Sequence, residues 1–139
     1  AQATCHAVYG GGDGVAWDQE AVALKGGADI IIATPGRLLS HMEQGNVDFS
    51  EVKHLILDEA DKMLNLGFKD EMSRIFKLLP KKRQNLLFSA TLSKDVDNIH
   101  QLLLDDPVVI KIEESLRNLF LHLGSFCLLN LAVLHQRSL

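Results

Sequence analysis

The chain has 139 residues, of which 47% are hydrophobic and 23% charged, a composition that excludes a disordered or fibrous protein and fits one globular domain. Its formal net charge of -4 excludes a generally basic surface, so any binding of nucleic acid must come from a local patch. The two cysteines, Cys5 and Cys127, lie far apart without metal-ligand spacing, which favours a reducing, cytosolic setting.

Short apolar runs alternate with segments of helical periodicity along most of the chain. In chain order, the predicted elements are a strand over 5–9, a helix over 16–25, a strand over 29–33, a helix over 36–45, a strand over 52–57, a helix over 68–80, a strand over 84–88, a helix over 93–104 and a strand over 107–112. Thr34 and Pro35 suit the start of the second helix, and Ser93 suits the cap of the fourth. We expect Trp17 to pack its helix against the sheet.

The alternation of strands and helices with short links predicts βαβ units, and therefore an α/β fold with a parallel sheet and helices on both faces. Ligands of such sheets bind beyond the carboxyl ends of the strands. Four polar or glycine-rich clusters stand at such ends and should share one rim: Gly10-Gly11, Thr34-Pro35-Gly36-Arg37, Asp58-Glu59-Ala60-Asp61 and Ser89-Ala90-Thr91. Alternatively, each cluster is an ordinary polar loop, which explains them singly but not their particular chemistry.

The acidic cluster follows an aliphatic strand, which is the pattern of a carboxylate that holds Mg²⁺ on a nucleotide. Asp58 would reach the Mg²⁺ directly or through water, and Glu59 would polarise an attacking water as general base. The alternative is that both carboxylates only favour the dipole of a helix N-terminus.

The remaining clusters are weaker signals when taken singly. Ser89 and Thr91 can hydrogen-bond the acidic cluster, with Asp61 as the nearest partner, or can cap a helix. Arg37 adds a charged donor at a helix N-terminus that attracts phosphate, or is a plain surface arginine. The glycine doublet can bring backbone amides close to a phosphate, or is only a turn.

Together and in this order, the four clusters resemble the motifs of the DEAD-box ATP-dependent RNA helicases. The flanking strings MLNLGF and RQNLLFSAT match this family as well, and the resemblance covers roughly residues 5 to 114. It implies a RecA-like three-layer fold, ATP and Mg²⁺ as cofactors, and RNA as the partner whose duplexes the parent protein unwinds. The family clamps ATP and RNA between two RecA-like domains, so the second domain of the parent chain is an implied partner.

The resemblance also implies a role for each matching residue. It assigns the binding and hydrolysis of Mg-ATP to Asp58 and Glu59, with Asp58 as the metal carboxylate. It assigns the coupling of ATP to RNA to Asp61, Ser89 and Thr91. It assigns contacts with the RNA sugar-phosphate backbone, which do not read sequence, to Gly10, Gly11, Thr34, Gly36 and Arg37.

The chain departs from the family in its phosphate-cradling loop, because it contains no Gly-Lys-Ser or Gly-Lys-Thr. By resemblance that loop follows a strand inside the sheet, so we expect an incomplete fold without its N-terminal strands and with a gap in the sheet. We expect residues 1–114 to be a partial N-terminal RecA-like helicase domain that alone neither hydrolyses ATP nor unwinds RNA. The alternative is a non-catalytic RNA-binding or interaction fragment; T-P-G-R beside D-E-A-D and S-A-T argues against a DNA helicase.

Residues 115–139 are an atypical apolar tail whose role the sequence does not reveal. The apolar stretch over 119–134 is shorter than the ~20 residues of a spanning helix, so we expect no membrane anchor. A packing helix and a tail created by a frame shift or a truncated gene model are both open. We expect the basic string 81–83 to be a solvated turn rather than an RNA contact. A cytoplasmic location is expected, or a nuclear one in a eukaryote, and the oligomeric state is left open.

Overall fold

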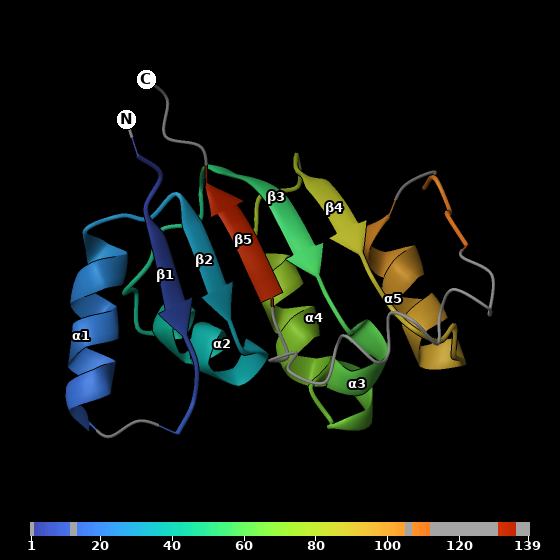
Figure 1. Cartoon of the computed structure of the whole chain (residues 1–139), viewed down its shortest axis with the longest axis horizontal. Helices are drawn as coiled ribbons and strands as arrows, with labels where there is room; N and C mark the ends of the chain where they lie inside the picture. Colours follow the sequence, from blue (N-terminus) through green and yellow to red (C-terminus); the bar gives the residue numbers. More distant parts are fainter. Residues whose placement is uncertain (1, 12–13, 105–106, 112–130, 136–139) are drawn as a thin grey trace.

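The computed structural model describes residues 2–11, 14–104, 107–111 and 131–135, and its elements are drawn in Figure 1. In chain order they are β1 (Cys5–Val8), α1 (Gly14–Lys25), β2 (Ile30–Ala33), α2 (Pro35–Glu43), β3 (Val52–Leu57), α3 (Ala60–Asn65), α4 (Lys69–Leu78), β4 (Gln84–Leu87), α5 (Lys94–Leu103) and β5 (Leu131–His135). The strands and helices predicted between residues 5 and 104 are therefore confirmed to within a few residues at each end. The short helix α3 is an addition to the prediction.

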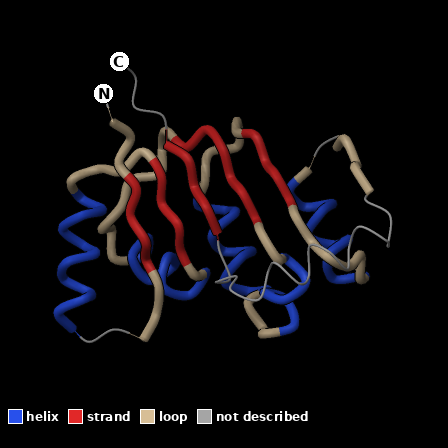
Figure 2. Tube along the Cα trace, viewed as in Figure 1, coloured by secondary structure: helices blue, strands red, loops and turns tan. Residues whose placement is uncertain are grey.

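The five strands form one sheet in the order β1-β2-β5-β3-β4, visible as the row of red segments in Figure 2. β1 pairs with β2 in parallel, and β3 pairs with β4 in parallel, as the βαβ pattern predicts. β5 lies between the two pairs and runs antiparallel to both of its neighbours. The sheet is therefore two parallel pairs joined by one reversed central strand.

β5 comes from the apolar tail, for which a packing helix was one expectation. Val133 pairs with Ile31 on one side and with Leu55 on the other. The described sheet has no gap at this position, so the expected gap is not found there. The predicted division at residue 114 falls outside the described residues and stays a prediction.

The core lies on one face of the sheet, where the described helices gather. In Figures 1 and 2, α2, α4 and α5 lie behind the strands. Ile31, Leu55 and Leu57, which point to that side, are buried, whereas Ile30, Ile32 and Ile56 on the other face are only partly buried. Three of the described helices, α2, α4 and α5, thus cover one face of the sheet. Members of the core include Leu24, Ile31, Leu38, Phe49, Leu55, Leu57, Met63, Met72, Ile75 and Ile99.

The strand predicted over 107–112 is wrong for the residues that the structure describes. Residues 107–111 have no regular structure, and Val108 and Ile110 are 89% and 84% exposed. A strand needs a hydrogen-bonded neighbour, and β4, at the end of the sheet, pairs only with β3 among the described strands. The β-branched run 107–112 has the local propensity of a strand, but its described residues have no neighbouring strand with which to pair.

Candidate functional site

The four clusters singled out in the sequence lie at one edge of the sheet. β1, β2, β3 and β4 all point their carboxyl ends to the lower edge of Figure 1, and each cluster begins within two residues of its strand end. β5 starts at the same edge, because Leu131 pairs with both Ala33 and Leu57. The predicted rim therefore exists, and β5 separates its two halves.

The glycine doublet follows β1 and is exposed to solvent. Gly11 has a φ of 103°, a conformation that side chains with a Cβ rarely adopt. No heavy atom lies within 4 Å of a Cβ built on Gly11, so the backbone angle rather than lack of space requires glycine here. The doublet exposes its backbone, as a contact to a phosphate needs.

The next cluster starts α2. Thr34 is the N-cap residue by its backbone angles, and Pro35 follows in the first turn as expected, but the Thr34 side chain makes no capping hydrogen bond. Its backbone N–H donates to Val8 O at 3.0 Å, which ties the end of β2 to the end of β1. Ser93 does cap α5, since its hydroxyl accepts from Val96 N at 3.3 Å.

Arg37 lies in the first turn of α2 and is bound to α1 through Glu20. Its Nε donates to Glu20 Oε2 at 2.7 Å, and the guanidinium carbon lies 4.5 Å from the centre of the Trp17 ring. His41 contacts the same carboxylate oxygen at 2.7 Å, and its ring stacks on Trp17. Trp17 thus packs on α2, whereas the sequence led us to expect packing on the sheet.

Sequence reasoning missed Glu20 and His41 as members of this cluster. Trp17 and Glu20 are three residues apart on α1, and Arg37 and His41 are four apart on α2. Each pair therefore lies on one face of its helix. That spacing was the available signal, but nothing in the sequence says that the two faces meet.

The acidic cluster begins directly after β3. The Asp58 Oδ1 accepts from Glu59 N at 2.9 Å, which fixes the carboxylate at the strand end. Glu59 has a φ of 52°, and among the described residues it is the one other than glycine whose φ is positive. Such a conformation costs about 1–2 kcal/mol for a residue with a Cβ, and strain of this kind is concentrated at functional sites.

The Glu59 side chain is only partly satisfied. Its Oε1 accepts from Lys62 Nζ at 2.6 Å, whereas Oε2 is buried without a hydrogen-bond partner. Within the described ranges, no group of three or more His, Cys, Asp or Glu side chains converges on one point. Two neighbouring carboxylates with a free oxygen fit Mg²⁺, which is usually bound by one or two carboxylates together with phosphates and water.

The acidic cluster and the hydroxyl cluster are in contact. Thr91 Oγ1 donates to Asp61 Oδ2 at 3.1 Å, which is the contact expected for Thr91. Asp61 is 8% exposed, and its Oδ1 also accepts from Lys62 N at 3.0 Å. The contact expected between Ser89 and the acidic cluster is not found, because the Ser89 hydroxyl donates to Thr91 O at 2.8 Å.

The basic string 81–83 splits into two kinds of residue. Lys81 and Lys82 are exposed, as expected for a solvated turn. Arg83 is partly buried, and its guanidinium donates to Asn85 Oδ1 at 2.9 Å and to Pro80 O at 2.6 Å. Burial lowers the pKa of Arg83 from its usual value. Arg83 thus stabilises the turn before β4.

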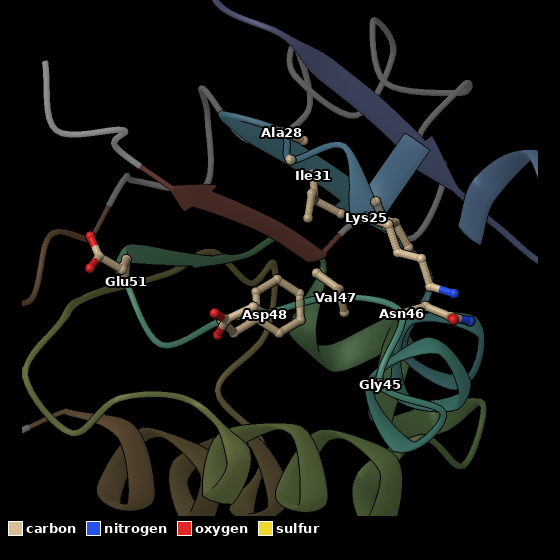
Figure 3. Close-up of a pocket in the computed structure, with 11 residues that line it drawn as sticks. Lys25, Ala28, Ile31, Gly45, Asn46, Val47, Asp48 and Glu51 are labelled. Carbon is tan, nitrogen blue, oxygen red and sulfur yellow. The ribbon is translucent and has the colours of Figure 1, made fainter. Parts of the chain in front are cut away.

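A cavity of about 420 Å³ lies away from the rim, at the opposite ends of the strands. Figure 3 shows Ala28, just before β2, and Ile31 of β2 on one side, and Val47 and Asp48 from the α2–β3 loop on the other. None of the predicted site residues lines it.

No helix in the described ranges combines the length and the hydropathy needed to cross a bilayer.

Comparisons with known proteins place the chain in one family. The family model for DEAD/DEAH box helicases matches residues 1–99. The ATP-dependent RNA helicase DeaD of Haemophilus influenzae is 38% identical over 111 residues, covering 80% of this chain and 18% of that protein. The ATP-dependent RNA helicase HAS1 of Candida albicans is 45% identical over 100 residues, covering 71% of this chain and 17% of that protein. The chain thus spans less than a fifth of the length of these two relatives.

A solved structure shows the same likeness. The crystal structure of a DEAD box protein from the hyperthermophile Methanococcus jannaschii matches with a TM-score of 0.70 and 36% identity, covering 76% of this chain and 28% of that one. At this level of identity the likeness confirms the predicted fold class, an incomplete RecA-like α/β domain.

Proposed function

The chain belongs to the DEAD/DEAH box helicase family, and from that premise we propose that it is part of the motor of an ATP-dependent RNA helicase. The parent protein would couple the binding and hydrolysis of ATP to RNA binding and to the unwinding of duplexes. The RNA, and the second RecA-like domain of the parent chain, would be its partners. Most of that protein's length lies outside the 139 residues, since the relatives are more than five times longer than the aligned region.

The acidic cluster is proposed to serve the nucleotide. Asp58 stands at the end of β3 with one carboxylate oxygen fixed by Glu59 N, and it would hold Mg²⁺ directly or through water. The bound Mg²⁺ would neutralise charge on the phosphates. Glu59 would orient and deprotonate the attacking water with Oε2, the oxygen that has no protein partner.

The other half of the rim is proposed to bind RNA. The exposed glycine doublet and the start of α2 offer backbone N–H groups, and a helix N-terminus favours a phosphate. Gly10, Gly11, Thr34, Gly36 and Arg37 would line this surface. Contacts of this type bind the sugar-phosphate backbone without reading the bases.

One observation carries the proposal of coupling, namely the hydrogen bond of 3.1 Å from Thr91 Oγ1 to Asp61 Oδ2. It joins two clusters 30 residues apart, at the ends of neighbouring strands. Asp61 follows the proposed water-orienting Glu59 by two residues, and Thr91 begins the chain that leads to α5. A change at the nucleotide would therefore reach the hydroxyl cluster through one contact.

The sequence lacks the Gly-Lys-Ser/Thr loop, so the 139-residue chain itself is proposed to be inactive as an ATPase. The test measures phosphate release by this chain and by the protein encoded by the longer reading frame, each with and without RNA. We expect RNA-stimulated hydrolysis only from the longer protein, and its loss there on Glu59→Gln. Hydrolysis by the 139-residue chain would contradict the inactivity, and none by either protein would contradict the helicase motor.

A second candidate is a non-catalytic RNA-binding fragment. The interlocked side chains around Arg37 favour it, because this half of the rim is held together by residues that are all present in the chain. RNA binding by the 139-residue chain, together with a reading frame that encodes no phosphate loop upstream, would select this candidate over the motor.

A further inference from the structure

We infer that Arg37, Glu20, Trp17 and His41 form a positioning network for the proposed RNA surface, in which Arg37 acts by locking α1 to α2 instead of binding a phosphate itself. This inference rests on the proposed RNA-binding function of the rim. It adds Glu20, Trp17 and His41 to the residues on which that function depends, and it gives Arg37 an indirect role.

The carboxylate of Glu20 is the centre of the network. Its Oε2 accepts from Arg37 Nε at 2.7 Å and lies 2.7 Å from His41 Nε2. The three side chains are 13%, 16% and 0% exposed, in the order Glu20, Arg37 and His41. Hydrogen bonds between charged groups are strengthened where water is excluded. A contact that is mostly buried on both sides is therefore a stable link between the two helices.

The proton positions in the network are consistent with one another. A carboxylate only accepts hydrogen bonds, so His41 Nε2 carries the proton that points to Glu20. The other ring nitrogen, Nδ1, then accepts from Asn46 Nδ2, which lies 3.1 Å away and is buried. Both nitrogens of the fully buried His41 are thereby satisfied, and the ring has one orientation.

The Trp17 ring closes the network from the α1 side. It stacks on the His41 ring with the centroids 3.7 Å apart and the planes 7° apart. The Arg37 guanidinium lies against the same Trp17 ring at 4.5 Å, in the range of a cation–π contact. The Nη2 atom of Arg37 is buried without a hydrogen-bond partner. A phosphate in solvent cannot reach that nitrogen in this arrangement.

The network determines where two helix N-termini lie relative to each other. Trp17 and Glu20 belong to the first two turns of α1, which follows the glycine doublet. Arg37 belongs to the first turn of α2, next to Thr34. Locking these turns together fixes the two proposed RNA-contact segments side by side, so that one RNA backbone can contact both.

The test compares RNA binding by variants of the 139-residue chain, using a fluorescent single-stranded RNA and anisotropy over a series of salt concentrations. Glu20→Gln removes a negative charge near the RNA surface, which by charge alone would tighten binding. A positioning role predicts the opposite, a loss of about tenfold, comparable to the loss of one hydrogen bond to a charged group. Glu43→Gln removes a carboxylate at the other end of α2, outside the network, and should not weaken binding.

Arg37 itself supplies the second readout. Arg37→Ala should weaken binding about as much as Glu20→Gln, and the double variant no further, because both changes break one link. The slope of log affinity against log salt should stay that of the wild type, whereas loss of a direct phosphate contact would reduce it by about 0.7. Arg37→Lys keeps the charge but not the planar fork, and should bind as weakly as Arg37→Ala.

The outcomes separate the positioning role of the network from the proposed RNA surface itself. If the wild-type chain binds RNA but Glu20→Gln binds equally or more tightly, or if Arg37→Ala reduces the salt slope, the positioning role is overturned and the RNA surface stands. If the wild-type chain binds no RNA, both fall. Circular dichroism of every variant checks that it is folded, and Arg37→Lys replaces Glu20→Gln as the deciding variant if the latter is unfolded.

Discussion

The two halves of the rim are held in different ways. In the half built on β1 and β2, side chains from α1 and α2 interlock in a buried network around Glu20. In the half built on β3 and β4, one side-chain hydrogen bond, from Thr91 to Asp61, joins the clusters beside the backbone bond from Ala60 N to Phe88 O, and Glu59 has a strained backbone. The proposed RNA surface is thus preformed by packing, whereas the backbone strain at Glu59 is of the kind found at functional sites.

The largest effect is expected where the two halves are joined, at β5. Val133 pairs with Ile31 of one half and Leu55 of the other. Val133→Pro removes a backbone N–H from the ladder and introduces a ring clash, so we expect a loss of about 3 kcal/mol or more in the free energy of unfolding. Urea denaturation followed by circular dichroism measures it.

A matched substitution distinguishes the loss of this strand from a general effect of proline. Val109 lies in the irregular, exposed segment 107–111, so Val109→Pro should change stability by no more than about 0.5 kcal/mol. Equal stability of the two variants would mean that the tail does not join the halves of the sheet.

The next effect concerns the interlocked half. His41→Leu introduces an apolar side chain of similar size and removes both ring nitrogens, which leaves the buried Asn46 amide without its partner. We expect a loss of about 2 kcal/mol, measured as the shift of the urea midpoint at constant slope. His6→Leu, at a partly buried position of β1, is the control and should cost far less. Similar losses for the two variants would show that the network contributes nothing of its own.

The strained backbone at Glu59 predicts that a glycine at this position gives a more stable protein than an alanine. Glu59→Ala and Glu59→Gly both remove the carboxylate and its ion pair with Lys62, so they differ mainly in the backbone at the positive φ. Glycine tolerates this conformation, and we expect the glycine variant to be more stable than the alanine variant by about 1 kcal/mol. Thermal unfolding of the pair compares them. A more stable alanine variant would mean that this corner is not strained.

Sequence reasoning succeeded where periodicity and motif order carried the information. Strand 52–57 and the helix before it could be predicted because their apolar patterns and breakers are local, and the shared rim followed from parallel strands. The position of β5 could not be predicted, because an apolar run of that length suits a helix or a strand equally and only its neighbours decide. Glu20 was missed for a similar reason, since its partners lie on another helix, 17 and 21 residues away.

The smallest effect is expected in the loosely held half, at the contact between its two clusters. Thr91→Val keeps the shape of the side chain and removes the hydroxyl that donates to Asp61. Thr91 is exposed and Asp61 keeps its bond from Lys62 N, so water can replace part of the loss and we expect only about 0.5 kcal/mol. Thr91→Ser retains the donor and should restore the stability of the wild type. If Thr91→Val cost more than His41→Leu in the same urea assay, the half that carries the acidic cluster would be the rigid one, and the contrast between the proposed RNA surface and the proposed catalytic corner would be reversed.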